Sequence, residues 1–324
     1  MPGRAGAGLA IAPTPVEERV AQARRALVLG VGGGGDVVGA LAIARRCEQL
    51  GTPFVLGGVA WERLPVDPVP GPRPTIQITG GEPLGRHAVL AGPDTATPEG
   101  VRFSESHVAA HLGAPTVLID ITEGPGGAAD GIGSAVDRLG CDLVVYADVG
   151  GDAIAAGDEP GLGSPLCDAV MLAAGLRLAD RVDGVLAVLG AGCDGELELG
   201  EVLGRVAALA AAGAWIGTSS VLPAVADELE RAAAGTATEA SMQVVHCARG
   251  VTGTAEIRGG RRRVPLGPAG AQAFYFDLAA AADVLPLTQA VLAAETLQAA
   301  RDAIRAGGSP TELDYELERA AADG

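Results

Sequence analysis

The sequence contains no lysine and no asparagine, and all 23 of its basic residues are arginine. Without a lysine amine the protein cannot form the Schiff base on which pyridoxal phosphate enzymes depend, so we expect no pyridoxal phosphate. The same absence excludes the P-loop nucleotide clamp and the strand lysine of protein kinases. Several large enzyme classes are therefore excluded by composition alone.

Positive charge is scarce as well, because 40 acidic residues against 23 arginines give a formal net charge of −17. A field of that sign repels phosphate backbones, so we expect no nucleic-acid partner. No apolar run approaches the roughly 20 residues that a membrane span needs, so we expect no membrane partner. The five cysteines include no CxxC pair, which predicts reduced thiols and a cytoplasmic location.

Aromatic residues make up only 3% of a chain that is 48% hydrophobic, so the core has to consist mainly of alanine, valine, leucine and isoleucine. We expect residues 1–15 to be a disordered tail and residues 16–324 to form a single α/β domain. Residues 61–115 carry many prolines and glycines and little periodicity, which indicates a long irregular insertion or a lid. Residues 255–324 are expected to form a C-terminal extension.

Continuous apolar strands alternate with helical segments through most of the chain. We predict strands over residues 27–29, 53–59, 116–120, 142–148, 185–190 and 214–217. We predict helices over residues 16–25, 36–50, 104–112, 126–139, 165–180 and 197–212, and one from Pro223 through the 230s. This alternation predicts a Rossmann-like α/β fold, with a mostly parallel sheet and helices on both faces. In the extension we predict a hairpin over 255–264, a strand over 271–278, and helices over 288–307 and 310–322.

A run of four glycines lies between the first core strand and the helix that follows it. Gly32, Gly33, Gly34 and Gly35 precede Asp36. In open α/β sheets such a turn binds ligands, and we expect these five residues to seat the polar end of a substrate. Close helix–strand packing is the alternative explanation.

The same turn satisfies the GxGxxG pattern of dinucleotide sites, but two features disagree with such a site. An NAD site needs an acidic residue at the end of the second strand, and the strand at 53–59 has none until Glu62. Moreover, the Asp36 carboxylate would repel a bare pyrophosphate unless a cation lies between them.

The strongest chemical signal follows the predicted strand at 142–148. Five carboxylates occur there within 21 residues, on a glycine-rich loop: Asp148, Asp152, Asp158, Glu159 and Asp168. Such a group needs compensation by a divalent cation such as Mg²⁺, by a cationic substrate, or by raised pKa values suited to acid–base catalysis. A solvated loop of an acidic protein is the alternative.

Candidate roles follow from this loop and from two other strand ends. The candidate catalytic residues are Asp148, Asp152, Asp158 and Glu159. The further candidate substrate-binding residues are Gly150, Gly151, Ser164, Asp120, Glu123, Thr218 and Ser219. We expect the loops that carry them to converge with the glycine turn at one edge of the sheet. Helix capping is the alternative for the two hydroxyls.

Four arginines cluster on the predicted hairpin: Arg258, Arg261, Arg262 and Arg263. They indicate either a solvated turn or a site that recognises an anion.

Two stretches carry a resemblance to a known family: Gly30-Val-Gly-Gly-Gly-Gly-Asp-Val-Val-Gly-Ala-Leu41, and Asp148-Val-Gly-Gly-Asp152 with Asp158-Glu-Pro-Gly-Leu-Gly-Ser-Pro165. They resemble domain-of-unknown-function family 1152, a prokaryotic family, and the resemblance covers nearly the whole chain. It implies no activity.

A second resemblance is to the D-glutamate cyclase family. Thr122-Glu-Gly-Pro-Gly-Gly-Ala-Ala129 and Gly157-Asp-Glu-Pro-Gly-Leu-Gly163 are similar to two of its segments. Glu123 and Asp158 stand where that family has Asp and Asn. The similarity implies that the Glu159 loop handles a small amino-acid-like or carboxylate substrate.

Three functions remain open on this basis. The first is a lyase, isomerase or hydrolase that acts on a small polar metabolite bearing a carboxylate or phosphate, by acid–base or metal-assisted chemistry. The second is a non-catalytic nucleotide- or metabolite-binding protein. The third is an NAD-dependent oxidoreductase. We also expect a homo-oligomer, with the C-terminal helices as a candidate interface.

Overall fold

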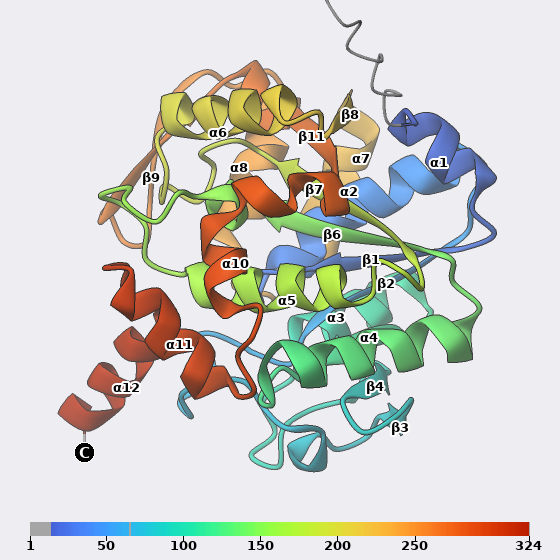
Figure 1. Cartoon of the computed structure of the whole chain (residues 1–324), viewed down its shortest axis with the longest axis vertical. Helices are drawn as coiled ribbons and strands as arrows, with labels where there is room; N and C mark the ends of the chain where they lie inside the picture. The colour runs from blue at the N-terminus through green and yellow to red at the C-terminus, as the bar shows by residue number, and fades with distance from the viewer. Residues whose placement is uncertain (1–13, 65, 324) are drawn as a thin grey trace, which may run out of the picture.

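A nine-stranded mixed sheet forms the centre of the protein, and the computed structural model describes residues 14–64 and 66–323 (Figure 1). The strand order is β3-β4-β5-β2-β1-β6-β7-β11-β8. The strands are β1 (Ala26–Gly30), β2 (Phe54–Val59), β3 (Glu82–Pro83), β4 (Ala88–Ala91), β5 (Thr116–Ile119), β6 (Leu143–Val149), β7 (Asp183–Leu189), β8 (Trp215–Ser220) and β11 (Gln272–Asp277). Nearly all of the tail expected at 1–15 lies outside the described residues.

The five central strands β5, β2, β1, β6 and β7 run parallel to one another. Every residue of β1 and β6 is buried, because apolar side chains point to both faces of the sheet and both faces are covered. This arrangement confirms the predicted Rossmann-like α/β fold with a mostly parallel sheet.

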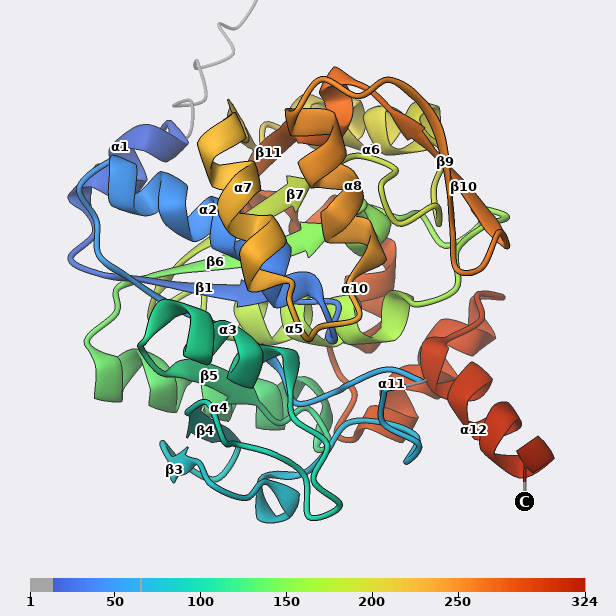
Figure 2. The ribbon, with the colours of Figure 1, turned by 180° about the vertical axis from the view of Figure 1, so that it is seen from behind.

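Helices cover each face, as Figures 1 and 2 show from opposite sides. One face carries α1 (Val16–Gln22), α2 (Asp36–Gln49), α3 (Ser104–Leu112), α7 (Pro223–Ala232) and α8 (Glu239–Ala248). The other carries α4 (Gly124–Leu139), α5 (Pro165–Arg177), α6 (Leu199–Ala211), α9 (Leu278–Ala281), α10 (Pro286–Val291) and α11 (Leu297–Ala306), and α12 (Glu312–Asp323) follows. The two core layers consist mostly of aliphatic side chains, as the composition predicts.

Residues 61–115 contain more regular structure than their sequence indicates. β4 pairs antiparallel with β5, and β3 pairs with β4, so this segment extends the main sheet at one edge. The helix predicted at 104–112 is α3. The two strands are two and four residues long, which is too short for a periodic pattern to be visible in the sequence.

Two helix predictions were wrong, because in each alanine-rich stretch a threonine caps the start of a second helix. The helix from Pro223 ends at Ala232, and α8 then starts after Thr238, whose hydroxyl accepts the Ser241 amide at 3.4 Å. The helix predicted over 288–307 is two helices, α10 and α11. The Thr296 hydroxyl accepts the Ala299 amide at 3.1 Å and caps the second.

The C-terminal extension completes the main sheet. β11 lies between β7 and β8 and is antiparallel to both. The predicted hairpin is present as β9 (Gly253–Ile257) and β10 (Arg262–Leu266), which form a separate two-stranded sheet. Within residues 14–64 and 66–323, no helix is long and apolar enough to cross a membrane. All five cysteines are free and buried.

Candidate active site

A cavity of about 100 Å³ lies where the loops after β1, β6 and β7 meet, at the carboxyl edge of the parallel strands. The glycine turn Gly32–Gly35 forms part of its wall. Its charged or hydroxyl-bearing lining residues are Asp36, Glu62, Arg63, Asp152, Ser164, Asp168, Asp194, Glu196, Thr238, Glu239 and Arg258. Loops following neighbouring parallel strands are where ligands bind in open α/β sheets.

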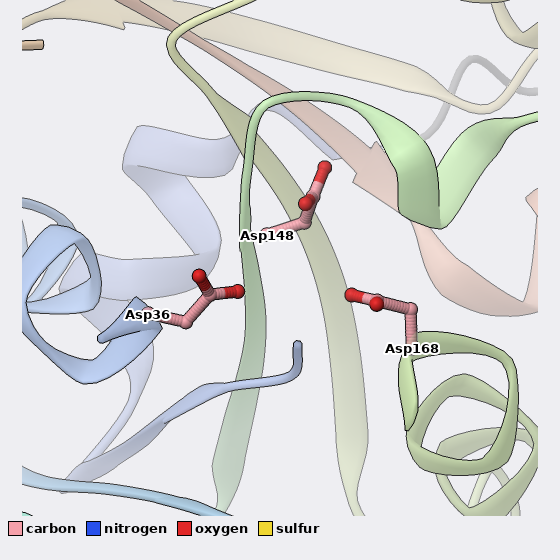
Figure 3. A group of neighbouring side chains, drawn as sticks. All are labelled: Asp36, Asp148 and Asp168. Atoms are coloured by element: carbon pink, nitrogen blue, oxygen red, sulfur yellow. The ribbon is translucent and has the colours of Figure 1, made fainter. Parts of the chain in front are cut away.

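Asp36, Asp148 and Asp168, which we call the first acidic trio, lie close together, and the Asp36 and Asp168 side chains are directed toward each other (Figure 3). Their nearest carboxylate oxygens all lie within 4.8 Å of one another. Asp36 opens α2, Asp148 lies near the end of β6, and Asp168 lies in the first turn of α5. Three separate elements of the core therefore hold the three carboxylates in place.

Two members of the first acidic trio are buried without hydrogen-bond partners. Asp148 and Asp168 are 0% and 1% exposed. Neither oxygen of either carboxylate has a hydrogen-bond partner among the described residues. Buried polar groups are normally hydrogen-bonded, and a buried charge without a partner is costly. Four orphaned oxygens in one cluster therefore call for a proton or a cation.

The pKa values of the first acidic trio follow from this environment. Burial raises the pKa of Asp36 to about 7, although the Gly32 amide and the Arg63 charge oppose the rise. Burial also raises the pKa of Asp148 and of Asp168 well above the usual range, and the carboxylates of the trio raise each other further. At neutral pH these carboxyl groups therefore favour the protonated form when no cation lies beside them.

The glycine turn is shaped around Asp36. The Gly32 amide donates to Asp36 Oδ2 at 3.0 Å, and a Cβ on Gly32 would lie 2.6 Å from the same oxygen. Gly33 and Gly34 have positive φ angles of 74° and 52°. The Asp36 carboxylate thus occupies the position at the start of a helix where a pyrophosphate lies in dinucleotide-binding folds.

Asp152, Asp194 and Glu196, the second acidic trio, also bring carboxylate oxygens within 4.8 Å of one another. Gly150, at a φ of 134°, allows their approach, because a Cβ there would lie 2.2 Å from Asp194 Cγ. Burial, with Glu196 as a further cause, raises the pKa of Asp194 to about 7. Burial and the neighbouring carboxylates raise the pKa of Asp152 well above its usual range.

Glu196 differs from the other five carboxylates because it is fully partnered. Its Oε2 accepts the amides of Gly163 and Ser164 at 2.7 and 2.9 Å. Its Oε1 accepts the Ser164 hydroxyl, and Nη1 of Arg262 at 2.8 Å. Burial alone would raise the pKa of Glu196, but the Arg262 charge and the Ser164 hydroxyl outweigh it and lower that pKa.

Arg63 and the C-terminal helix α12 complete the wall of the site. Arg63 Nη2 donates to the Gly32 carbonyl and to Glu312 Oε1, the latter at 3.2 Å. Its guanidinium lies 4.2 Å from the centre of the Trp61 ring. Glu312 also accepts the Cys167 amide at 2.8 Å, in the first turn of α5. The C-terminal helix therefore caps the helix that carries Asp168.

The structure brings some of the sequence-predicted residues to the cavity and not others. The glycine turn, Asp36, Asp152 and Ser164 line the cavity, and Asp148 lies against it within the first acidic trio. Gly150 and Gly151 form the turn before Asp152, where a Cβ on Gly151 would lie 2.8 Å from Val202. The structure therefore places these residues at the cavity or directly beside it.

Asp158 and Glu159, two of the four candidate catalytic residues, are not brought into the cavity. Asp158 is exposed. The Glu159 carboxylate accepts the amides of Ala156 and Gly157 at 2.6 and 2.8 Å, so it stabilises the turn of its own loop. Since local amides lie in reach, the carboxylate closes on them rather than facing the site.

The predicted residues after β5 and on β8 also lie away from the cavity. Asp120 accepts the amides of Thr75 and Thr122 at 2.8 and 2.9 Å. Glu123 pairs with Arg86, Thr218 is exposed, and the Ser219 hydroxyl lies 2.7 Å from the Tyr275 hydroxyl. None of these four candidates lines the cavity, because β2 separates β5 from β1 and β11 separates β8 from β7.

Several residues of the site were not among the candidate catalytic or binding residues, among them Arg63, Asp194, Glu196 and Glu312, and Asp168 was predicted only as one of the five loop carboxylates. Asp194 and Glu196 follow the strand predicted at 185–190, so the strand-end rule that selected Asp148 could also have selected them. Arg63 and Glu312 carry no local signal, because their partners are distant in the sequence.

The family model described as Protein of unknown function (DUF1152) matches residues 27–320. The chain therefore belongs to this family. Neither the curated proteins nor the solved structures give a significant match. The matched range runs from β1 into α12 and contains both acidic trios.

Proposed function

We propose that the protein is a divalent-cation-dependent enzyme that acts on a small anionic metabolite, and that the first acidic trio holds the cation. The observation that carries this proposal is the set of four buried, unpartnered oxygens on Asp148 and Asp168. The trio offers only oxygen ligands and no histidine or cysteine, a combination that suits hard cations such as Mg²⁺ or Mn²⁺.

The second acidic trio supports an acid–base role beside the cation. A bound cation polarises a substrate oxygen or lowers the pKa of a bound water. Asp194, with a pKa of about 7, is suited to give or take a proton near neutral pH. Arg63 and Arg258 line the same cavity and offer positive charge to an anionic substrate. These groups support lyase, isomerase or hydrolase chemistry.

Cation binding is tested by titrating the EDTA-treated, dialysed full chain with Mn²⁺ or Mg²⁺ in a calorimeter. We expect the native protein to bind the cation and Asp168→Asn to bind it about 100-fold more weakly, because one ligand charge is lost. Asp180→Asn, the same change at an exposed residue beyond the end of α5, is the matched control and should bind as the native protein does. A native protein that binds neither cation would contradict the proposal.

Turnover distinguishes an enzyme from a binding protein. The native protein and Asp168→Asn are incubated with a metabolite extract and Mg²⁺, and the extract is followed by mass spectrometry. Loss of one metabolite and growth of another, only with the native protein, supports an enzyme. Retention of a metabolite without conversion favours the non-catalytic alternative. The five free, buried cysteines support a reducing, cytoplasmic compartment for either function.

A further inference from the structure

A second hollow, larger than the cavity, shares Glu196 with it. This groove measures about 770 Å³, against about 100 Å³ for the cavity. Its walls come from the loop at Pro160 and Gly161, from residues 195–201 at the start of α6, and from the β9–β10 hairpin. Figure 2 shows the hairpin standing out from the body of the protein beside α6. Sites for small molecules typically measure roughly 300–1,000 Å³, so the groove has the size of such a site.

The hairpin turn supplies arginines to both hollows. Arg261, Arg262 and Arg263 line the groove, and Arg258 lines the cavity. Arg258 has a φ of 55° and is the one non-glycine residue with positive φ among the described residues. That conformation is uncommon for a long side chain, and such strained positions cluster at binding sites.

The two outer arginines of the groove are weakly neutralised. Arg263 pairs with Glu256 at 3.4 Å, and both side chains are largely exposed. Arg261 donates to the Arg258 carbonyl at 2.9 Å, and the ion pairs of the described residues include none to Arg261. Three consecutive arginines along one wall stand out in a chain of net charge −17.

The opposite wall of the groove carries three carboxylates, those of Glu196, Glu198 and Glu201. Glu198 and Glu201 form a capping box at the start of α6, in which the side chain of each glutamate accepts the backbone amide of the other. Their carboxylates are thereby committed to the amides of their own helix. The arginines of the hairpin are the cationic contacts that this groove offers to an anion.

We propose that the groove binds a phosphate-bearing part of the substrate, whose reacting end enters the acidic cavity past Arg262 and Glu196. The inference rests on the proposed function and adds the substrate class to it. Guanidinium groups bind phosphate through paired hydrogen bonds, and Arg261 and Arg263, which no buried carboxylate holds, offer such pairs. The cavity is large enough for a cation and one reacting group, whereas the groove accommodates the rest of the molecule.

Inorganic pyrophosphate is the probe for this site, titrated calorimetrically in EDTA so that no divalent cation takes part. The native chain should bind pyrophosphate, and Arg261→Gln/Arg263→Gln should bind it about tenfold more weakly or worse. Arg24→Gln/Arg138→Gln is the matched control, since both arginines are exposed and each pairs with an acidic residue elsewhere. The control should retain native affinity, and all three proteins should melt at similar temperatures.

Absence of pyrophosphate binding to the native chain in EDTA would overturn the groove proposal. The proposal would also be overturned if both double variants lost the same affinity for pyrophosphate, or if neither lost any. If pyrophosphate binds only with Mg²⁺ and is lost in Asp168→Asn but kept in Arg261→Gln/Arg263→Gln, the anion binds the cation instead, and only the groove proposal fails. If pyrophosphate binds the groove as expected while the native chain takes up no cation, the proposed function fails and the groove remains.

Discussion

The two acidic trios lie at the same edge of the sheet but differ in how their charges are compensated. In the first, Asp148 and Asp168 are buried and their oxygens lack partners among the described residues. In the second, Glu196 is held by Arg262, two backbone amides and a hydroxyl. Burial is common to both, so burial alone does not mark a metal site. The first acidic trio differs in gathering four unpartnered carboxylate oxygens, whereas the second has one, on Asp194.

The difference also appears in the direction of the pKa shifts. The pKa of Asp36 rises to about 7, and those of Asp148 and Asp168 rise well above their usual range, because desolvation dominates. Desolvation acts on Glu196 too, but its pKa falls because Arg262 and Ser164 outweigh the cost of burial. Glu196 is therefore held in its ionised form, whereas the three carboxyl groups of the first acidic trio favour the protonated form in the absence of a cation.

The pH dependence of stability should show this contrast most strongly. A raised pKa means that the folded state of Asp36 or Asp194 holds a proton that the unfolded state, with an ordinary value of 3.8, releases. The stability gained in this way is complete below about pH 4 and lost as the pH rises toward 7. In EDTA we expect the free energy of unfolding to fall by on the order of 3 kcal/mol across that interval, after allowing for the partial exposure of Asp36.

Urea melts between pH 4 and 8 measure this slope. Asp36→Asn should flatten it, because the asparagine does not titrate. Glu196→Gln should have no such effect above pH 5, because the lowered pKa of Glu196 affects stability only as the pH falls through the acid range. A steeper or unchanged slope in Asp36→Asn would contradict the assignment of the shift.

Addition of a cation at neutral pH should separate the two trios next. At 100 times its dissociation constant, Mg²⁺ or Mn²⁺ should raise the free energy of unfolding of the native protein by about 2.7 kcal/mol. Asp148→Asn should lose this increment, because it removes a ligand of the first acidic trio, while Glu196→Gln should keep most of it. Thermal melts with and without cation measure the increments. Equal losses in the two variants would show that the trios form one site.

Removing the Glu196 carboxylate should lower the free energy of unfolding of the cation-free protein, by less than the two effects above. Glu196→Gln leaves the Arg262 guanidinium without its carboxylate, and we expect a loss of about 2 kcal/mol, because Arg262 retains some solvent contact. Asp168→Asn should cause no loss in EDTA at pH 8, because it relieves repulsion within the first acidic trio. Chemical denaturation of both variants in EDTA measures the two changes in the free energy of unfolding. A loss in both variants, or in neither, would refute this prediction.

The glycine turn and the acidic stretch after β6 were predictable because their signals are local. A strand, a glycine run and a helix start lie within 17 residues from Ala26 to Ala42, and the Asp148–Asp152 stretch follows its strand directly. Asp158 and Glu159 belong to the same stretch, but loop amides engage Glu159 and solvent reaches Asp158. Composition identifies acidic residues on a loop; it does not say in which direction each one points.

The remaining misplacements arise from strand order. Asp120 follows β5, and Thr218 lies on β8. Their loops could converge with the glycine turn only if β5 and β8 were neighbours of β1 and β6, and the strand order shows that they are not. The C-terminal strand β11 enters between β7 and β8, so Thr218 is carried away from the cavity. No pattern near Thr218 contains that information.

The amino-acid sequence by itself determined the layered α/β architecture, the glycine turn, and the presence of carboxylates at the ends of the strands, because those features follow from apolar periodicity and local backbone chemistry. Only the tertiary structure decided which carboxylates are compensated. Arg262 reaches Glu196 across 66 residues of sequence, and Glu312 reaches the start of α5 across 145. Asp148 and Asp168 receive no such partner from the described residues, and that long-range difference makes one cluster a candidate cation site and the other a candidate proton-transfer site.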